Sequence, residues 1–421
     1  GIERMCEKRL RPHRGLRVYR RPGEMSYREP AKNGKDVHLT LDVALQKDLR
    51  KLLQSTGCNG AIVILDTASG DVLAAVSWPG FNLNTYRAHY NDLAGLSKRP
   101  AKDDPTKMVC TPSALRARAN HPLLSRALTG VYPPGSTIKP VTALAGLGAR
   151  VITPHTPIAC TGINRHARNG QPRCWIYKMY SGRTHGELDL FQALKKSCNI
   201  YFVEVAHRLG PQRLADWFRR FGFGERPGMG LSPSEESKGM LKRSNFIPSD
   251  AWFMAIGQGE ISATPLQVTA AHATIARDGL YLSPRLSLEG APEQVQRHIP
   301  ITPDQARVVR RGMHAVVHEQ RGTAYTYWHG ATAGPDLGIE IGGKTGTATA
   351  PKLLIDTDGD GKRDTLVSEG DHAWFAGFAP YRDPQVAFAV ILEYAGSGGK
   401  NAVPIAKEAL RICQKHGYLP K

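Results

Sequence analysis

Long apolar runs, acidic residues and cysteines are all scarce in this 421-residue sequence. No stretch of 18 or more apolar residues is present, so the sequence predicts no membrane-spanning helix within these residues. No secretory signal peptide is visible, and the chain begins at Gly1 instead of Met. No internal repeat is found. The apolar and charged fractions are ordinary for a globular protein, so a large buried core is expected.

The shortage of acidic residues makes the chain strongly basic. It has 56 Lys and Arg against 37 Asp and Glu, a formal net charge of +19. Such a surface favours anionic partners: nucleic acid, anionic lipid headgroups or an acidic polymer. No recognised nucleic-acid-binding motif accompanies the charge, so no nucleic-acid partner is expected.

The cysteines are few, odd in number and scattered: Cys6, Cys58, Cys110, Cys160, Cys174, Cys198 and Cys413. A sparse, odd set in a long chain is not a disulfide framework.

The order of the predicted elements indicates one large α/β domain over 37–421. Within 36–54 a strand is expected to pass into an amphipathic helix, and 60–77 form a hairpin. Further strands are expected in 339–349 and 372–394, with a closing helix from about 401 to 416. Strands at both chain ends would complete one sheet. The basic residues 1–36 are interpreted as an N-terminal arm or the remnant of a preceding module.

One short stretch places a hydroxyl and an amine three residues apart, at Ser136 and Lys139. The Pro-Pro-Gly turn before it and the apolar spacing after it predict a loop that leads into a buried helix. Ser136 would open that helix, where one interpretation is a simple N-cap. The other is chemical: residues three apart share a helix face, so a lysine kept neutral by burial can take the hydroxyl proton and activate the serine.

Two later stretches supply partners for this pair. The segment KKSCNIYF places Ser197 and Asn199 two apart, and GGKTGTA places 344–347 on what reads as an edge strand. In chain order the three stretches read S-x-x-K, S-x-N and K-T-G, the signature of penicillin-binding proteins and class A β-lactamases. Any one of these motifs is weak, whereas three in order are strong.

From about Asp36 to the C-terminus the sequence resembles class B penicillin-binding proteins, most of all the elongation-type penicillin-binding protein 2. The segments GAIVILDTASGDVLAAVSWPGFN, GELDLFQALKKSCNIYF, AIGQGEISATPLQV and HAWFAGFAP carry the likeness beyond the motifs. The resemblance implies the transpeptidase fold shared with serine β-lactamases: a central antiparallel sheet flanked by helices, with a helical subdomain. It also implies a pedestal module and membrane anchor, mostly missing here, that would hold the full-length protein at the periplasmic face of the cytoplasmic membrane.

The activity implied by the resemblance is that of a peptidoglycan D,D-transpeptidase and β-lactam target that works in cell elongation and shape maintenance. Ser136 would attack the penultimate D-Ala carbonyl of a stem peptide, and the acyl group would pass to an amine of a neighbouring stem. Lys139 would act as base, and Ser197 would relay a proton to the leaving amine. No catalytic cofactor is implied. A glycosyltransferase of the elongation machinery is the implied partner.

The remaining motif residues would bind substrate. Asn199 offers an amide donor and acceptor to the substrate backbone. The strand residues Lys344, Thr345 and Thr347 would receive the terminal carboxylate, and Gly346 lets the strand approach closely. Backbone N–H groups of the nucleophile and of Thr347 would form the oxyanion hole.

Three cysteines lie close together in sequence, Cys160, Cys174 and Cys198, with His185 between the last two. They would be ordinary buried thiols, a Cys160–Cys174 disulfide, or the ligands of a closed structural zinc site. The resemblance favours zinc, because elongation-type relatives carry a metal site beside the second motif, with a Cys inside that motif and a His in the H-G segment. Cys160 and Cys174 match less securely. His166 is an alternative candidate ligand of this zinc site.

The stretch Asp356–Asp364 resembles a calcium loop, because Asp356, Asp358 and Asp360 alternate before a glycine. Its twelfth position is Val367 instead of Glu, and no flanking helix pair is evident. Calcium is therefore not expected, and the stretch is interpreted as a solvated insertion after the third motif.

Two other functional classes share parts of this pattern. A β-lactamase or D,D-carboxypeptidase would use water in place of the amine, but no convincing deacylating glutamate is found; Glu187 and Glu204 are unmatched candidates. A non-catalytic β-lactam sensor would keep Ser136 and Lys139, and only the wider resemblance argues against it.

Overall fold

The centre of the computed structural model is an antiparallel five-stranded sheet in the order β13-β16-β17-β3-β4. Its strands are β3 (Gly60–Asp66), β4 (Val72–Trp78), β13 (Gly342–Thr349), β16 (Asp371–Ala379) and β17 (Val386–Leu392). The structure describes residues 1–101, 104–106, 108–331, 333–357 and 362–421. Strand β3 pairs with β17, so the prediction that the two chain ends complete one sheet is confirmed.

The sheet is buried on both faces, and the alternation of its side chains divides the molecule into two cores. In β3, for example, Val63 belongs to one core and Ile62 and Ile64 to the other. The helix α12 (Pro265–Ala276) is buried over its whole length against the first face. The helices α3 (Val43–Ser55) and α15 (Val403–Lys415) cover the second.

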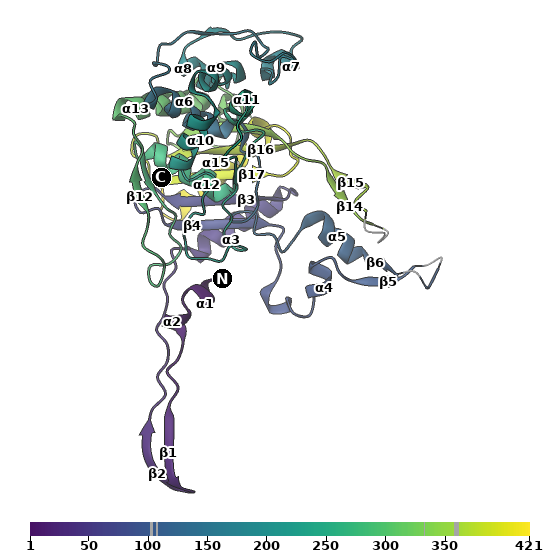
Figure 1. Cartoon of the computed structure of the whole chain (residues 1–421), viewed down its shortest axis with the longest axis vertical. Coiled ribbons are helices and arrows are strands. Elements are labelled where there is room, and N and C mark those ends of the chain that lie inside the picture. The colour runs from purple at the N-terminus through teal and green to yellow at the C-terminus, as the bar shows by residue number, and fades with distance from the viewer. Residues whose placement is uncertain (102–103, 107, 332, 358–361) are drawn as a thin grey trace.

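A group of helices gathers at the β13 edge of the sheet (Figure 1). It comprises the turn η2 (Gly135–Ile138) and helices α6 (Lys139–Gly148), α7 (Trp175–Met179), α8 (Leu190–Lys195), α9 (Asn199–Leu209), α10 (Pro211–Arg220), α11 (Pro248–Met254) and α13 (Pro303–His318). The helices α6, α9 and α10 pack on one another around apolar side chains such as Leu144, Phe202 and Trp217. This arrangement is the predicted helical subdomain.

Two extensions project from this body (Figure 1). The first carries α1 (Ile2–Met5), α2 (Glu7–Leu10), β1 (Leu16–Arg21) and β2 (Glu24–Glu29). The second, the lateral wing, carries η1 (Leu83–Thr85), α4 (Tyr90–Leu93), β5 (Lys98–Pro100), β6 (Met108–Cys110), α5 (Pro112–Asn120), β14 (Leu353–Ile355) and β15 (Thr365–Ser368). The hairpin β1–β2 points away from the helical group. The domain boundary at residue 36 stays a prediction.

Short elements complete the fold: β7 (Ile158–Cys160), β8 (Gly186–Leu188), β9 (Met240–Leu241), β10 (Ile261–Ser262), β11 (Leu280–Leu282), β12 (Gln296–His298), α14 (Tyr325–His329) and η3 (Gly398–Ala402). Within the described residues, no helix combines the length and the apolar character needed to cross a bilayer. The strand expected ahead of α3 is wrong: Leu39 makes only an isolated bridge to Ser287. The closing helix is found as α15.

Candidate active site

Ser136 lies in the tight turn η2, which packs against strand β13. The turn begins at Gly135, whose φ of +55° favours glycine. A Cβ at Gly135 would lie 3.2 Å from the Thr347 carbonyl oxygen, and one at Gly346 would lie 3.0 Å from the Thr137 Cγ2 atom. Small residues on both sides therefore let the turn and the strand touch.

The interpretation of Ser136 as an N-cap is wrong. Helix α6 begins at Lys139, its N-cap position is Ile138, and no side chain caps it. Ser136 sits one short turn earlier and is half-buried. Its hydroxyl makes no hydrogen bond to any described residue, which leaves the oxygen available for chemistry.

Lys139 is fully buried and points its amine at the second motif. Its Nζ donates to the Ser197 carbonyl at 2.7 Å, the Ser197 hydroxyl at 3.2 Å and the Asn199 Oδ1 atom at 2.7 Å. These three acceptors match the three donors of an ammonium group. No hydrogen bond between Lys139 and the Ser136 hydroxyl is found among the described residues, so the contact expected from their spacing is absent in this geometry.

Ser197 is the point at which the three motifs meet. It lies between α8 and α9, is 5% exposed, and adopts a left-handed conformation with φ of +53°. Its hydroxyl accepts from Lys344 at 2.8 Å as well as from Lys139. Left-handed backbone at a residue other than glycine costs free energy, and such strain clusters at functional sites.

The two lysines are electrostatically coupled through this hydroxyl. Burial lowers the pKa of Lys139 to about 8, although the nearby cysteine sulfurs oppose the shift. Burial, and next the charge of Lys139, lower the pKa of Lys344 well below its usual value. Two cations this close disfavour each other.

The other predicted substrate residues flank this centre. The Asn199 Nδ2 atom donates to the Arg173 carbonyl at 2.9 Å, while its Oδ1 atom faces Lys139. On β13, Thr347 is exposed, and its hydroxyl accepts from the Gly398 amide at 3.2 Å. Thr345 is only 7% exposed. The structure thus brings the first motif, the second motif and strand β13 together at Ser197, with Lys139 and Lys344 both bonded to its hydroxyl, but the roles of these residues remain predictions.

Two neighbours of the site were missed in the sequence. His272, in α12, is buried, and its Nε2 atom donates to the carbonyl of Thr137, the residue after Ser136, at 3.1 Å. Burial lowers the pKa of His272 to about 4, so its ring is neutral at physiological pH. Thr323 pairs its hydroxyl with that of Thr345 at 2.6 Å. A polar residue within an apolar run such as α12 was the available signal for His272; Thr323 gave none.

The four predicted zinc ligands converge beside Ser197. The ligand atoms of Cys160, Cys174, His185 and Cys198 all lie within 4.8 Å of one another. His166 is not in this group; it pairs with Glu204 at 2.8 Å.

The distances within this group fit a tetrahedral metal site. The Sγ atoms of Cys174 and Cys198 are 3.9 Å apart, and the His185 Nδ1 atom lies 3.6 Å from Cys160 Sγ and 3.5 Å from Cys174 Sγ. Zinc bonds of about 2.3 Å to sulfur and about 2.0 Å to nitrogen give tetrahedral edges of roughly 3.8 Å and roughly 3.5 Å. Hydrogen bonds from Cys160 and Cys198 also hold the pKa of the Cys174 thiol well below its usual range. All seven cysteines are free, so the alternative disulfide is not formed here.

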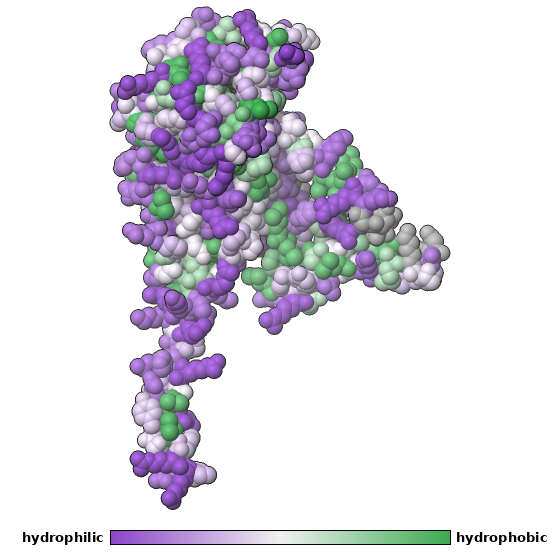
Figure 2. Space-filling view, viewed as in Figure 1, coloured by the Kyte–Doolittle hydropathy of each residue, from purple (hydrophilic) through white to green (hydrophobic). Residues whose placement is uncertain are grey.

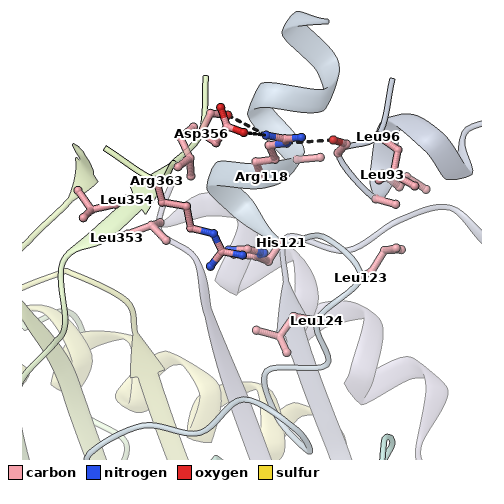
Figure 3. A pocket seen from close by; sticks show the side chains of 14 residues that line it. Leu93, Leu96, Arg118, His121, Leu123, Leu124, Leu353, Leu354, Asp356 and Arg363 are labelled. Atoms are coloured by element: carbon pink, nitrogen blue, oxygen red, sulfur yellow. Dashed lines mark hydrogen bonds and ion pairs between the residues drawn. The ribbon is translucent and has the colours of Figure 1, made fainter. Parts of the chain in front are cut away.

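A separate hollow of about 600 Å³ lies in the lateral wing (Figure 3). Leucines of α4, of the loop after α5 and of β14 line it, and Arg118 of α5 crosses it to donate to the Asp356 carbonyl at 2.8 Å. None of the three motifs contributes to its lining. The calcium interpretation concerns this part of the chain, but residues 358–361 lie outside the described residues.

Comparison with known proteins points to one family. The sequence profile described as "Penicillin binding protein transpeptidase domain" matches residues 60–411. Peptidoglycan D,D-transpeptidase MrdA of Haemophilus influenzae is 33% identical over 407 residues, which are 90% of this chain and 56% of that protein. The chain thus spans little more than half the length of this relative.

Solved structures agree with the sequence comparison. Penicillin-binding protein 2 (PBP2) of Pseudomonas aeruginosa, in complex with WCK 5153, is similar with a TM-score of 0.70 and 31% identity, covering 90% of this chain and 79% of that one. PBP2 of Helicobacter pylori, in complex with MreC, is similar with a TM-score of 0.79 and 25% identity, covering 100% and 72%.

Proposed function

Because this chain belongs to the penicillin-binding protein transpeptidase family, we propose that it cross-links peptidoglycan stem peptides through an acyl-serine intermediate and is a target of β-lactams. The observation that carries the proposal is the convergence of the three motifs at one atom. The Ser197 hydroxyl oxygen accepts hydrogen bonds from the Nζ atoms of Lys139, at 3.2 Å, and Lys344, at 2.8 Å. It lies beside the turn that contains Ser136.

In the first step, the Ser136 oxygen attacks the carbonyl carbon of the penultimate D-Ala. The hydroxyl proton passes to Lys139, which must therefore be neutral at that moment. The C–N bond to the terminal D-Ala then breaks, and its nitrogen takes a proton that Ser197 relays from Lys139. The backbone N–H groups of Ser136 and Thr347 would stabilise the oxyanion, typically by about 3–4 kcal/mol per donor.

In the second step, an amine of a neighbouring stem peptide attacks the acyl-serine. A new amide bond forms, the ester bond to Ser136 breaks, and the serine oxygen regains a proton. The reaction needs no oxidant, reductant or catalytic metal, because each step only exchanges an acyl group and a proton. Water in place of the amine would give hydrolysis.

Substrate binding itself would set the charges of the two lysines. The terminal carboxylate, received by Lys344, Thr345 and Thr347, favours the protonated form of Lys344. A cation at Lys344 in turn disfavours protonated Lys139, whose amine shares the Ser197 hydroxyl. The bound carboxylate therefore moves the base toward the neutral form that attack requires.

We also propose that Cys160, Cys174, His185 and Cys198 hold a structural zinc ion. Three thiolates and one imidazole would fill its four positions and leave none for water, so the ion would supply rigidity and take no part in the reaction. Support comes from the tetrahedral separations of the ligand atoms and from the burial of the three cysteines. Because Cys198 lies between Ser197 and Asn199, the ion would fix the second motif.

The cell-biological setting follows from the chemistry and the relatives. Cross-linking of stem peptides takes place outside the cytoplasmic membrane, so we place the chain there, in the periplasm, anchored to the inner membrane in the full-length protein. Cross-linking also needs freshly polymerised strands, so a glycosyltransferase of the elongation machinery is its proposed partner. The similarity to a PBP2 solved with MreC supports a role in elongation and cell shape.

Labelling with a fluorescent penicillin tests this function, and decay of the label separates it from the alternatives. A transpeptidase forms one covalent adduct per chain that persists for hours, whereas a β-lactamase loses the label in seconds to minutes. Release of D-Ala and transfer to an added amine exclude a non-catalytic sensor. Absence of any adduct would refute the proposal.

A further inference from the structure

One stretch beside the second motif, residues 161–186, carries charge of a single sign; we call it the cationic segment. It contains Arg165, Arg168, Arg173, Lys178 and Arg183 and no acidic residue. All five basic side chains are exposed. Among the described residues, none of the five side chains makes a hydrogen bond or ion pair, so their charges are not neutralised internally.

The Cys/His cluster folds this segment into two loops. The first loop leaves the cluster after Cys160 and returns at Cys174, and the second runs on from Cys174 to His185. Both ends of each loop therefore meet at one buried point beside Cys198. Figure 1 shows this part of the chain, which includes α7, at the far end of the molecule from the hairpin β1–β2. Hydrophilic residues dominate that end in Figure 2.

Each loop is also tied directly to the second motif. In the first, the Arg173 carbonyl accepts from the Asn199 Nδ2 atom at 2.9 Å. In the second, the Trp175 Nε1 atom donates to the Lys196 carbonyl at 3.0 Å, one residue before Ser197. The backbone of the loops that carry the basic side chains is therefore fixed to the second motif by these two hydrogen bonds.

An acidic residue of the neighbouring helix α9 does not offset this charge. Glu204 is already paired, with Arg208 at 2.8 Å and with His166 at 2.8 Å. The five basic side chains of the cationic segment therefore face solvent with no ion-pair partner among the described residues. Exposed cations act over about 8–10 Å at ionic strengths near physiological.

We propose that the cationic segment binds the side carboxylates of stem peptides, so that the chain acts on stems whose glutamate and diamino-acid carboxyls are free and not amidated. The inference rests on the proposed function and specifies its substrate. The terminal carboxylate of the stem is assigned to Lys344, Thr345 and Thr347 on β13, so the side carboxylates need a second cationic site. The cationic segment is tied to the second motif at Asn199 and Lys196. Its guanidinium groups suit planar carboxylates, which they bind through paired hydrogen bonds.

The test compares two synthetic stem pentapeptides that end in D-Ala-D-Ala, one with both side carboxyls free and one with both amidated. The wild-type chain is expected to release D-Ala from the free form with a kcat/KM roughly tenfold higher, mainly through KM. The triple variant Arg168→Gln, Arg173→Gln, Arg183→Gln should reduce that ratio to near one. Raising the salt concentration from 50 to 500 mM should weaken the wild-type preference in the same way.

A matched control removes the same charge elsewhere. The triple variant Arg17→Gln, Arg20→Gln, Arg21→Gln alters exposed residues of β1 and should leave the tenfold ratio intact. The inference would be overturned if the wild-type chain had the same kcat/KM on both peptides. It would also be overturned if the first variant lost kcat/KM equally on both peptides, or if the control lowered the ratio of the two kcat/KM values as much as the first variant does. Penicillin labelling of the wild type is the separate check: if no adduct forms, it is the proposed function that fails.

Discussion

At the scale of single residues, the site depends on two lysines that burial makes poor cations. Neither Lys139 nor Lys344 exposes any side-chain surface, and both donate to Ser197. Their separation in sequence gave no hint that they share one hydroxyl. The motif order predicted which residues belong to the site, but not that Lys139 contacts Ser197 instead of Ser136, because that contact depends on the packing of α6 against α9.

The pH dependence of acylation should report Lys139. Its pKa is lowered to about 8, and only the neutral amine can accept the Ser136 proton. Below that pH the second-order rate constant of benzylpenicillin acylation should rise about tenfold per pH unit, and above it the rate should level off. Stopped-flow measurement between pH 6 and 10 checks this. A rate that falls as pH rises through 8 would show that Lys139 is not the base.

Replacing Lys344 should weaken the reaction without ending it. The variant Lys344→Ala removes the carboxylate partner and the field on Lys139 but leaves Ser136 and Lys139 in place. We expect the acylation rate constant to fall by roughly 10²-fold, measured by gel fluorescence over time. The exposed strand residue Lys98 gives a control, Lys98→Ala, that should not slow the reaction. An unchanged rate in Lys344→Ala would remove β13 from the carboxylate site.

At the scale of elements, the site lies at the interface between β13 and the helical subdomain. Continuous apolar runs predicted β3, β16 and β17, because strands buried on both faces leave a plain sequence signal. The short elements β7, β8 and α7 left no such signal, since they are held by the Cys/His cluster and by contacts distant in sequence. The strand expected at Leu39 does not form, because among the described residues Leu39 pairs only with Ser287, in an isolated bridge.

The close approach of β13 to the turn that contains Ser136 depends on Gly346. A Cβ there would lie 2.9 Å from Trp374 Cβ and 3.1 Å from the Pro134 carbonyl oxygen, so Gly346→Ala must push β13 away from the turn that carries Ser136. We expect acylation to slow by roughly tenfold to 10²-fold and the free energy of unfolding to fall by about 1–2 kcal/mol. Acylation kinetics and urea denaturation measure the two effects.

Gly80→Ala is the matched control, because the nearest atom to its added Cβ is an Arg50 side-chain nitrogen at 3.7 Å. Its acylation rate should equal that of the wild type. Equal rates in Gly346→Ala and the wild type would mean that the close approach of strand and turn is not needed.

The Cys/His cluster should couple stability to catalysis. If zinc occupies it, a strong chelator should lower the melting temperature by at least about 5 °C and slow acylation together, since the ion fixes the segment of Ser197 and Asn199. Cys174→Ser should do the same without chelator, whereas Cys58→Ser, outside the cluster, should not. Elemental analysis should give close to one zinc per chain. Zinc far below one, with Cys160 blocked to alkylation until reduced, would favour the disulfide instead.

At the scale of the whole molecule, a net charge of +19 favours anionic partners and is compatible with the proposed peptidoglycan substrate. The sheet and helical subdomain hold the site rigidly, and the hairpin β1–β2 and the lateral wing extend from that body without contributing to the three motifs (Figure 1). Composition predicted an anionic partner, and this stays a prediction. The chemistry came only from the motifs and from the geometry that joins them.

Ser136 is the proposed nucleophile, and intact-mass spectrometry after incubation with benzylpenicillin tests this role. The wild-type chain and the surface control Ser55→Ala should each gain the mass of one penicilloyl group, and peptide mapping should place it on Ser136. Ser136→Ala should gain none while its circular dichroism and melting temperature stay close to those of the wild type. A penicilloyl adduct on folded Ser136→Ala, or on another residue of the wild type, would contradict the assignment of Ser136 as the nucleophile.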